Sequence, residues 1–184
     1  MILIRHGQSE WNAAYNRARV DPGIPDPPLT AVGRDQALRA AEMLADRQMA
    51  RLLVSPYRRT IQTAEIIARE LALPMVIEPL VRERTAFSCD VGTVRTHLAG
   101  AWPHLRFDHL DEVWWPAEES EAELAARCDR FRHHVRGLTD WSRVAVISHW
   151  GFIRGLTGQE ARNGEAVAFN PHGASQEDAA GQAL

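Results

Sequence analysis

The sequence predicts an α/β fold in which a mostly parallel β-sheet lies between two layers of helices. Uninterrupted apolar runs at residues 1–4 and 144–147 are typical of strands that are buried on both faces of a parallel sheet. Segments with apolar residues at helical spacing lie between these runs. Because strands alternate with amphipathic helices, we expect a three-layer α/β/α sandwich that forms one domain over residues 1–184.

The composition sets limits on partners and location. The chain is 45% hydrophobic and 24% charged, and its net charge of −3 offers no basic field that would attract nucleic acid or anionic lipid. No apolar run reaches the length of a membrane span and no secretory signal is visible, so we expect a cytoplasmic protein with no nucleic-acid or membrane partner. Cys89 and Cys128 lack zinc-ligand spacing and are expected to be free thiols.

The first strand, residues 1–4, ends at the polar triplet Arg5-His6-Gly7. Open α/β sheets bind their ligands outside the carboxyl ends of strands, which is where this triplet is expected to lie. Arginine offers a bidentate cationic fork, histidine a titratable nitrogen and glycine close access to the backbone. Together they suit a phosphate group, so the triplet is the first candidate site.

The next segments predict a loop, a helix, a strand and a second helix. Four prolines within residues 22–28 favour a loop over the same end of the sheet. Thr30 is expected to cap a helix whose apolar stripe is Ala37, Ala40, Ala41 and Leu44. Residues 52–54 follow as a short strand. Ser55 as the N-cap and Pro56 as the first residue then begin the second helix.

Arg58 and Arg59 fall in the first turn of that second helix. Cations at this end oppose the helix macrodipole, and a bound anion would reverse the effect. The two arginines are therefore either solvated surface residues or ligands for an anion.

The second half of the chain continues the alternation of strands and helices. Expected elements are a strand at 74–77, a long helix at 118–138, a strand at 144–147, a short helix at 152–156 and an edge strand at 165–169. Charges on the long helix are expected to form a solvated face, whereas Cys128 belongs to its buried stripe. Residues 84–116 fit no clear pattern beyond a short helix near 94–98 and are interpreted as a substrate-covering insertion. The small, polar tail at 171–184 is expected to be poorly ordered.

Two histidines, His6 and His149, each follow an apolar strand directly. Adjacent parallel strands would bring both to one edge of the sheet. Arg5 precedes the first histidine, and Arg59 lies in the first turn of a predicted helix. These four residues together favour one shared anion site over two histidines with separate structural roles.

Five blocks in chain order resemble the histidine phosphatase superfamily, also called the phosphoglycerate mutase-like family. The blocks are residues 5–12 (RHGQSEWN, with the RHG motif), 29–37 (LTAVGRDQA), 55–64 (SPYRRTIQTA), 80–83 (LVRE) and 148–151 (SHWG). The triplet alone is a short motif, but five ordered blocks across most of the chain are specific. The resemblance implies the phosphoglycerate mutase-like α/β/α fold.

The resemblance also implies roles for individual residues. His6 would be the nucleophile that takes the phosphoryl group, and Glu83 would be the general acid that protonates the leaving oxygen. Arg5, Arg59 and His149 would bind the phosphoryl oxygens. Cationic neighbours should keep His6 unprotonated, whereas Glu83 needs a raised pKa to hold its proton.

Further contacts to the substrate are expected from Gly7, Ser9, Asn12, Arg58 and Trp150. The spacing after the Ser-Pro pair favours Arg59 over Arg58 as the phosphate clamp, and both stay open. Trp150 occupies a position where the family usually has glycine, and residues 84–93 replace the family's Gly-aromatic-Glu segment. Both departures border the leaving group, so the sequence does not identify the substrate.

The leading interpretation is a metal-independent phosphatase that hydrolyses a small phosphomonoester through a phosphohistidine intermediate. Arginines and a histidine supply the positive charge, so no cofactor or metal is expected. A mutase-type phosphoryl transfer and a non-catalytic phospho-ligand binder are the alternatives. The short chain without lysine favours hydrolysis over mutase chemistry, and the oligomeric state stays open.

Overall fold

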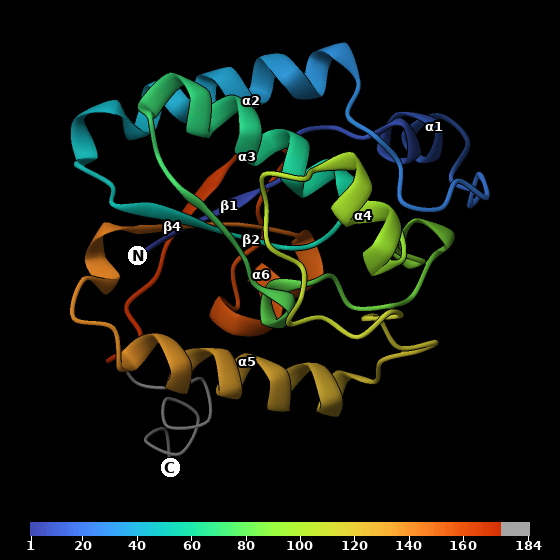
Figure 1. The fold of residues 1–184 in the computed structure, drawn as a ribbon. Helices are drawn as coiled ribbons and strands as arrows, with labels where there is room; N and C mark the ends of the chain where they lie inside the picture. The colour runs from blue at the N-terminus through green and yellow to red at the C-terminus, as the bar shows by residue number, and fades with distance from the viewer. Residues whose placement is uncertain (174–184) are drawn as a thin grey trace.

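The computed structural model describes residues 1–173 and contains a five-stranded sheet between helical layers (Figure 1). The strands are β1 (Ile2–Arg5), β2 (Arg51–Val54), β3 (Met75–Ile77), β4 (Val144–Ser148) and β5 (Ala166–Ala168). Their order in the sheet is β3-β2-β4-β1-β5, and only the β1–β5 pairing is antiparallel. The expected α/β fold with a mostly parallel sheet is confirmed, and β5 is the edge strand that the sequence predicts.

Helices cover both faces of the sheet. They are α1 (Glu10–Ala18), α2 (Ala31–Leu44), α3 (Arg58–Leu71), α4 (Arg95–Ala101), α5 (Glu121–Arg136) and α6 (Trp150–Thr157). Short 3₁₀ turns are η1 (Ala45–Arg47), η2 (Pro79–Val81), η3 (Ser88–Asp90) and η4 (Trp141–Arg143). In Figure 1, α2, α3 and α4 lie on one side of the sheet and α5 and α6 on the other.

Alternate residues of β1, β2 and β4 enter different hydrophobic cores, as the pleat of a strand requires. In β1, Ile2 and Ile4 belong to the cluster that contains Leu44 of α2, whereas Leu3 faces the cluster that contains Phe131 of α5. Leu3 and Ile4 are both fully buried. The uninterrupted apolar run is therefore explained by burial on both faces.

Helix α1 lies between the first strand and the proline-rich loop, in a stretch for which the sequence predicts no helix. A capping box starts it: Ser9 Oγ accepts the Asn12 N–H at 3.2 Å, and Asn12 Oδ1 accepts the Ser9 N–H at 3.1 Å. The helix is short and mostly polar, and Trp11 is its one buried residue. An apolar stripe, the main sequence signal for a helix, is therefore missing.

Helix α3, the helix predicted to begin at Pro56, starts at Arg58, two residues later than expected, with Tyr57 at the N-cap. Ser55 does not act as the cap, because its hydroxyl is hydrogen-bonded to His149 Nε2 at 2.8 Å. Ser55, which resembles a helix cap in the sequence, instead links the residue after β2 to His149, the residue after β4. Arg58 and Arg59 still lie in the first turn, as predicted.

The long helix α5 begins at Glu121, three residues later than expected, because Ser120 forms a capping box with Glu123. Its charges do not all form a solvated face: Arg127 is 2% exposed and Arg132 is 8% exposed, so that expectation is wrong for both. Cys128 does lie in the core, and burial raises the pKa of its thiol to about 12.

Residues 84–116 contain η3 and α4 and contribute Leu98 and Phe107 to the core. Their role as a substrate cover stays a prediction. The expectation for the tail concerns mainly residues 174–184, which lie outside the described part of the chain. Within residues 1–173, no helix combines the length and hydropathy that crossing a membrane would take.

Candidate active site

The carboxyl ends of β1 and β4 bring the two histidines together. These strands are parallel neighbours, with Arg5 paired to Ser148, and the backbone N–H of His6 donates to the Ser148 carbonyl at 2.9 Å. The rings of His6 and His149 consequently lie edge to face, with centroids 5.2 Å apart. Adjacent parallel strands thus place side by side two residues that are 143 positions apart in the chain.

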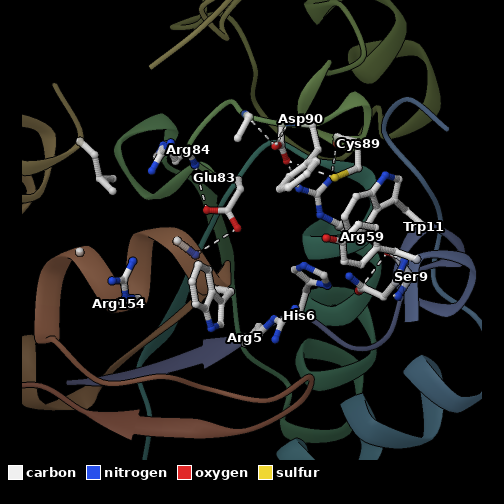
Figure 2. Close-up of a pocket in the computed structure, with 18 of the residues that line it drawn as sticks. Arg5, His6, Ser9, Trp11, Arg59, Glu83, Arg84, Cys89, Asp90 and Arg154 are labelled. Carbon is white, nitrogen blue, oxygen red and sulfur yellow. Dashed lines mark hydrogen bonds and ion pairs between the residues drawn. The ribbon is translucent and has the colours of Figure 1, made fainter. Parts of the chain in front are cut away.

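A cleft of ≈ 1000 Å³ opens at this edge (Figure 2). The residues expected in the site that line it are Arg5, His6, Ser9, Asn12, Arg59, Glu83 and Trp150. Figure 2 shows His6 and Glu83 on facing sides of the hollow, with Arg59 beside them. His149, Gly7 and Arg58 are not part of the lining.

A backbone contact defines the tautomer of His6. Its Nδ1 lies 2.7 Å from the Gly7 carbonyl oxygen, which can only accept, so Nδ1 carries the proton and Nε2 keeps its lone pair. Burial, followed by the charges of Arg59 and Arg5, holds the pKa of His6 well below its usual value. The imidazole is therefore neutral near pH 7.

Arg59 is fixed by groups that the sequence did not point out. Its Nη1 donates to the Cys89 carbonyl at 2.7 Å, its Nη2 pairs with Asp90 Oδ1 at 3.2 Å, and its guanidinium lies 4.3 Å from the Tyr57 ring centre. Sequence reasoning missed Asp90, because an aspartate in an irregular stretch carries no spacing signal. Burial of Arg59 in the cleft favours it over Arg58 as the phosphate clamp.

Two buried nitrogen atoms at this edge lack a hydrogen-bond partner among residues 1–173. They are Nε of Arg5 and Nδ1 of His149. The Nη1 of Arg5 donates to the Ala161 carbonyl at 3.0 Å, and Nε2 of His149 is bonded to Ser55. Nε of Arg5 is a donor, and Nδ1 of His149 is a donor only in the tautomer in which Ser55 Oγ donates to Nε2. Because buried polar atoms without partners are costly, a ligand with acceptor oxygens would complete the site in that tautomer.

Glu83 rests against the first turn of α6. Its carboxylate accepts the N–H groups of Gly151 at 3.1 Å, Phe152 at 3.2 Å and Arg84 at 2.9 Å. Burial, then the charge of Asp90, raises the pKa of Glu83 despite these hydrogen bonds. A raised pKa is what a proton donor in this cleft requires.

Gly7 and Arg58 have structural surroundings that do not depend on a ligand. A Cβ on Gly7 would lie 2.2 Å from the Gly33 carbonyl oxygen, and the Gly7 N–H already donates to Thr63 Oγ1 at 3.1 Å. The Arg58 N–H donates to Asp26 Oδ1 at 2.9 Å. Their expected contact with substrate stays a prediction.

Two groups of aromatic side chains line the cleft, and in Figure 2 Arg154 and Trp11 lie on opposite sides of His6. Trp150 is 37% exposed, with the Arg154 guanidinium 5.3 Å from its ring centre. Trp11 stacks on Tyr15 at 4.6 Å, and Phe87 packs against both rings. Of these five cleft residues, the sequence pointed only to Trp150; Arg154 lies one helical turn after it, and that spacing was an unused signal.

The described residues offer no obvious metal centre. Over residues 1–173, no group of three or more histidine, cysteine, aspartate or glutamate side chains is placed to hold an ion. Metal independence of any reaction stays a prediction.

The site is a cationic pocket in which an unprotonated histidine nitrogen faces a buried carboxyl group, an arrangement suited to a phosphoryl-type anion. The description "Histidine phosphatase superfamily (branch 1)" belongs to the family model that matches residues 1–179. The chain therefore belongs to the histidine phosphatase superfamily.

Two curated relatives have similar sequences. "Probable phosphoglycerate mutase GpmB" of Proteus mirabilis is 33% identical over 152 residues, which cover 81% of this chain and 68% of that protein. Glucosyl-3-phosphoglycerate phosphatase of Mycolicibacterium vanbaalenii is 32% identical over 166 residues, which cover 85% of this chain and 72% of that protein.

Solved structures support the fold. A mycobacterial glucosyl-3-phosphoglycerate phosphatase in complex with VO3 has a TM-score of 0.62 and 24% identity, with 90% of this chain and 88% of that chain covered. A structure titled "Mycobacterial hydrolase 1" has a TM-score of 0.63 and 21% identity, with 97% and 93% covered.

Proposed function

We propose that this protein hydrolyses a small phosphomonoester through a phosphohistidine on His6, with Glu83 as the general acid. The observation that carries the proposal is the state of His6: its Nδ1 is bonded to a carbonyl, which leaves Nε2 unprotonated beside a cationic cleft. A neutral imidazole held between arginines suits nucleophilic attack on phosphorus.

In the first step, His6 Nε2 attacks the phosphorus atom and the bond to the leaving oxygen breaks. Glu83 gives its proton to that oxygen, so the product departs as an alcohol. Arg5 and Arg59 line the cleft and offer donors to the equatorial oxygens, where charge is spread in phosphoryl transfer. His149, which lies against His6 outside the lining, would add its Nδ1–H in the tautomer in which Ser55 Oγ donates to Nε2. Ser9 and Asn12 are secondary contacts at the rim of the same pocket.

In the second step, water attacks the phosphorus atom and the phosphorus–nitrogen bond breaks. Glu83, now ionised, takes a proton from that water. Inorganic phosphate leaves, and His6 returns to its neutral form. Splitting the hydrolysis in this way replaces one hard displacement by two easier ones.

Mutase chemistry is the second candidate, and the similarity to the protein named as a phosphoglycerate mutase favours it. The similarity to a phosphatase of glucosyl-3-phosphoglycerate favours hydrolysis. We prefer hydrolysis because these 184 residues contain no lysine and therefore no lysine-rich segment that would hold a second phosphate group. A non-catalytic binder fits less well, since the nucleophile and the acid are both present. The cytoplasmic location stays a prediction.

The test is turnover of phenyl phosphate without a bisphosphate activator, in the presence of EDTA. Wild-type protein should release phosphate and give acid-labile, base-stable labelling after a quench. His6→Ala should lose turnover and labelling. Unchanged turnover in EDTA-treated His6→Ala would refute the mechanism, and a requirement for a bisphosphate would favour the mutase.

A further inference from the structure

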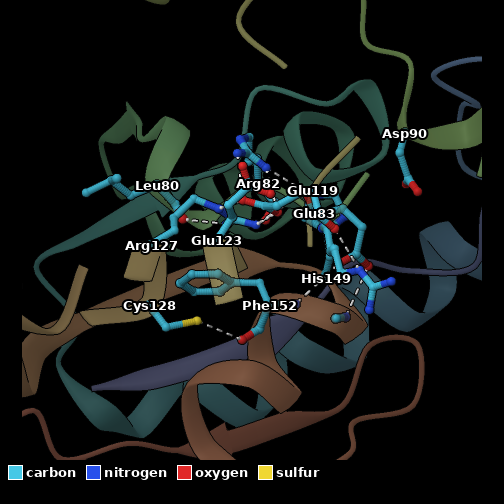
Figure 3. Close-up of polar contacts among 12 residues, drawn as sticks. Leu80, Arg82, Glu83, Asp90, Glu119, Glu123, Arg127, Cys128, His149 and Phe152 are labelled. Carbon is cyan, nitrogen blue, oxygen red and sulfur yellow. Dashed lines mark hydrogen bonds and ion pairs between the residues drawn. The ribbon is translucent and has the colours of Figure 1, made fainter. Parts of the chain in front are cut away.

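The segment that carries Glu83 is held by buried side chains rather than by regular secondary structure (Figure 3). Arg127 Nη1 donates to the carbonyls of Leu80 at 2.8 Å and Arg82 at 2.7 Å. Arg82 Nη1 donates to the Glu83 carbonyl at 3.1 Å. Arg127 on α5 and its neighbours therefore fix the main chain on both sides of the proposed acid.

Glu119 fixes the two arginines in turn. Its carboxylate pairs with Arg127 Nε at 2.8 Å and Nη2 at 2.5 Å, and with Arg82 Nη1 at 2.9 Å and Nη2 at 2.8 Å. The side chains of Glu119, Arg127 and Arg82 are 3%, 2% and 13% exposed. Burial acts to raise the pKa of Glu119, but its hydrogen bonds and the arginine charges outweigh it and hold the pKa below its usual value.

Arg127 also touches the helix that holds the Glu83 carboxylate. Its guanidinium lies 5.3 Å from the ring centre of Phe152, whose N–H donates to Glu83. The Arg127 side chain thus contacts both the main chain next to Glu83 and Phe152, one of the residues whose N–H groups bind the Glu83 carboxylate. A planar guanidinium can donate to the carbonyls of Leu80 and Arg82 and to the Glu119 carboxylate at the same time. An ammonium group cannot make these hydrogen bonds in the same geometry.

We infer that Arg127 and Glu119 are positioning residues that set the location of the Glu83 carboxyl group for proton transfer. This inference rests on the proposed function, in which Glu83 protonates the leaving oxygen. Neither residue lines the cleft, so both act through Glu83. Buried ion pairs give little stability compared with apolar packing, which is consistent with a use in fixing geometry.

The experiment compares two substrates that differ in their need for an acid. Phenyl phosphate requires protonation of its leaving oxygen, whereas 2,4-dinitrophenyl phosphate releases a stable anion. Arg127→Lys and Glu119→Gln should each lower kcat/KM for phenyl phosphate by about 10-fold or more and for the dinitrophenyl ester by less than about threefold. Glu83→Gln should show the same selectivity with a loss of roughly 100-fold for phenyl phosphate.

The matched control is Arg132→Lys. Arg132 is a buried arginine of the same helix, but it donates to the Leu156 carbonyl at 3.0 Å, at the far end of α6. This variant should affect both substrates alike. In the Glu83→Gln background, Arg127→Lys should cause no further selective loss.

Circular dichroism melting first shows which variants are folded. Glu119→Gln keeps the size of the side chain, and Arg127→Lys keeps its charge. Equal losses on both substrates in the folded Arg127→Lys and Glu119→Gln proteins would overturn the positioning role while leaving the proposed function intact. If Glu83→Gln itself shows no selectivity, the assigned acid fails, and the inference fails with it.

Discussion

Gly151 allows the backbone of α6 to approach the proposed acid. A Cβ at this position would lie 2.4 Å from Glu83 Oε1, and the Gly151 N–H donates to Glu83 Oε2 at 3.1 Å. The glycine is required by this close approach rather than by backbone strain, since its φ is not in the left-handed region.

Gly151→Ala should therefore displace the Glu83 carboxyl group. We expect kcat/KM for phenyl phosphate to fall by about 10-fold or more, because a displacement of about 1 Å can cost that much. Gly100→Ala is the control, since a Cβ there meets nothing within 4 Å. Full activity of Gly151→Ala with phenyl phosphate would contradict this account of the glycine.

At the scale of elements, the turn η3 controls the charge next to the cleft. The Asp90 carboxylate pairs with Arg59 and accepts the N–H groups of Ala86 at 3.1 Å and Phe87 at 3.0 Å. It also raises the pKa of Glu83 by repulsion between the two carboxylates. Through Asp90, this turn contacts Arg59, the proposed phosphate clamp, and also influences the pKa of Glu83, the proposed acid.

Asp90→Asn removes that repulsion with little change of shape. The pKa of Glu83 should fall, so the alkaline limb of kcat/KM for phenyl phosphate should move to lower pH than in the wild type. The pH–rate profile measures this shift directly. Asp108→Asn, a change at an exposed aspartate, should leave the limb in place; an unmoved limb in folded Asp90→Asn would argue against Glu83 as the titrating acid.

Element α6 also carries the side chain that should select the leaving group. Trp150 is partly exposed in the cleft and lies under the Arg154 guanidinium. Trp150→Ala should raise KM for 1-naphthyl phosphate by about 5-fold or more through lost stacking, with little change for 2-glycerol phosphate. Trp150→Phe should keep most of the preference. Equal effects of Trp150→Ala on the two esters would exclude a stacking role.

At the scale of the whole molecule, the site places two neutral histidines in the interior. Burial and the neighbouring arginines lower the pKa of His6 and His149 well below the usual value of 6.5. Below pH 6.5 the unfolded chain gains protons that the folded state does not bind, so the free energy of unfolding decreases as pH falls.

The stability should therefore drop between pH 6.5 and pH 5, by up to about 1.4 kcal/mol per pH unit for each histidine. Urea unfolding at several pH values measures the slope. His6→Gln should lower that slope, because one of the two buried groups is removed. If the free energy of unfolding varies with pH equally in the wild type and in His6→Gln between pH 5 and 6.5, His6 is not a neutral, buried group.

The sequence determined the parts of the fold that depend on local pattern. Apolar runs predicted β1, β2, β3 and β4, helical stripes predicted α2, α3 and α5, and five motif blocks predicted the family. It failed at α1, which is held by a capping box and one buried tryptophan. It also placed the start of α3 too early, because Ser55 uses its hydroxyl across the sheet edge rather than for a cap.

Only the tertiary structure decided how the candidate site is held. Asp90 is hydrogen-bonded to Arg59, and Glu119 and Arg127 are hydrogen-bonded to the Glu83 segment, across 31 to 47 positions of the chain. Such contacts produce no periodicity or spacing signal in the sequence, because any charged residue in a loop or on a helix could make them. A strand that ends in His6 can be recognised from its neighbours in sequence; the side chains that fix Glu83 opposite it can be recognised only once the chain has folded.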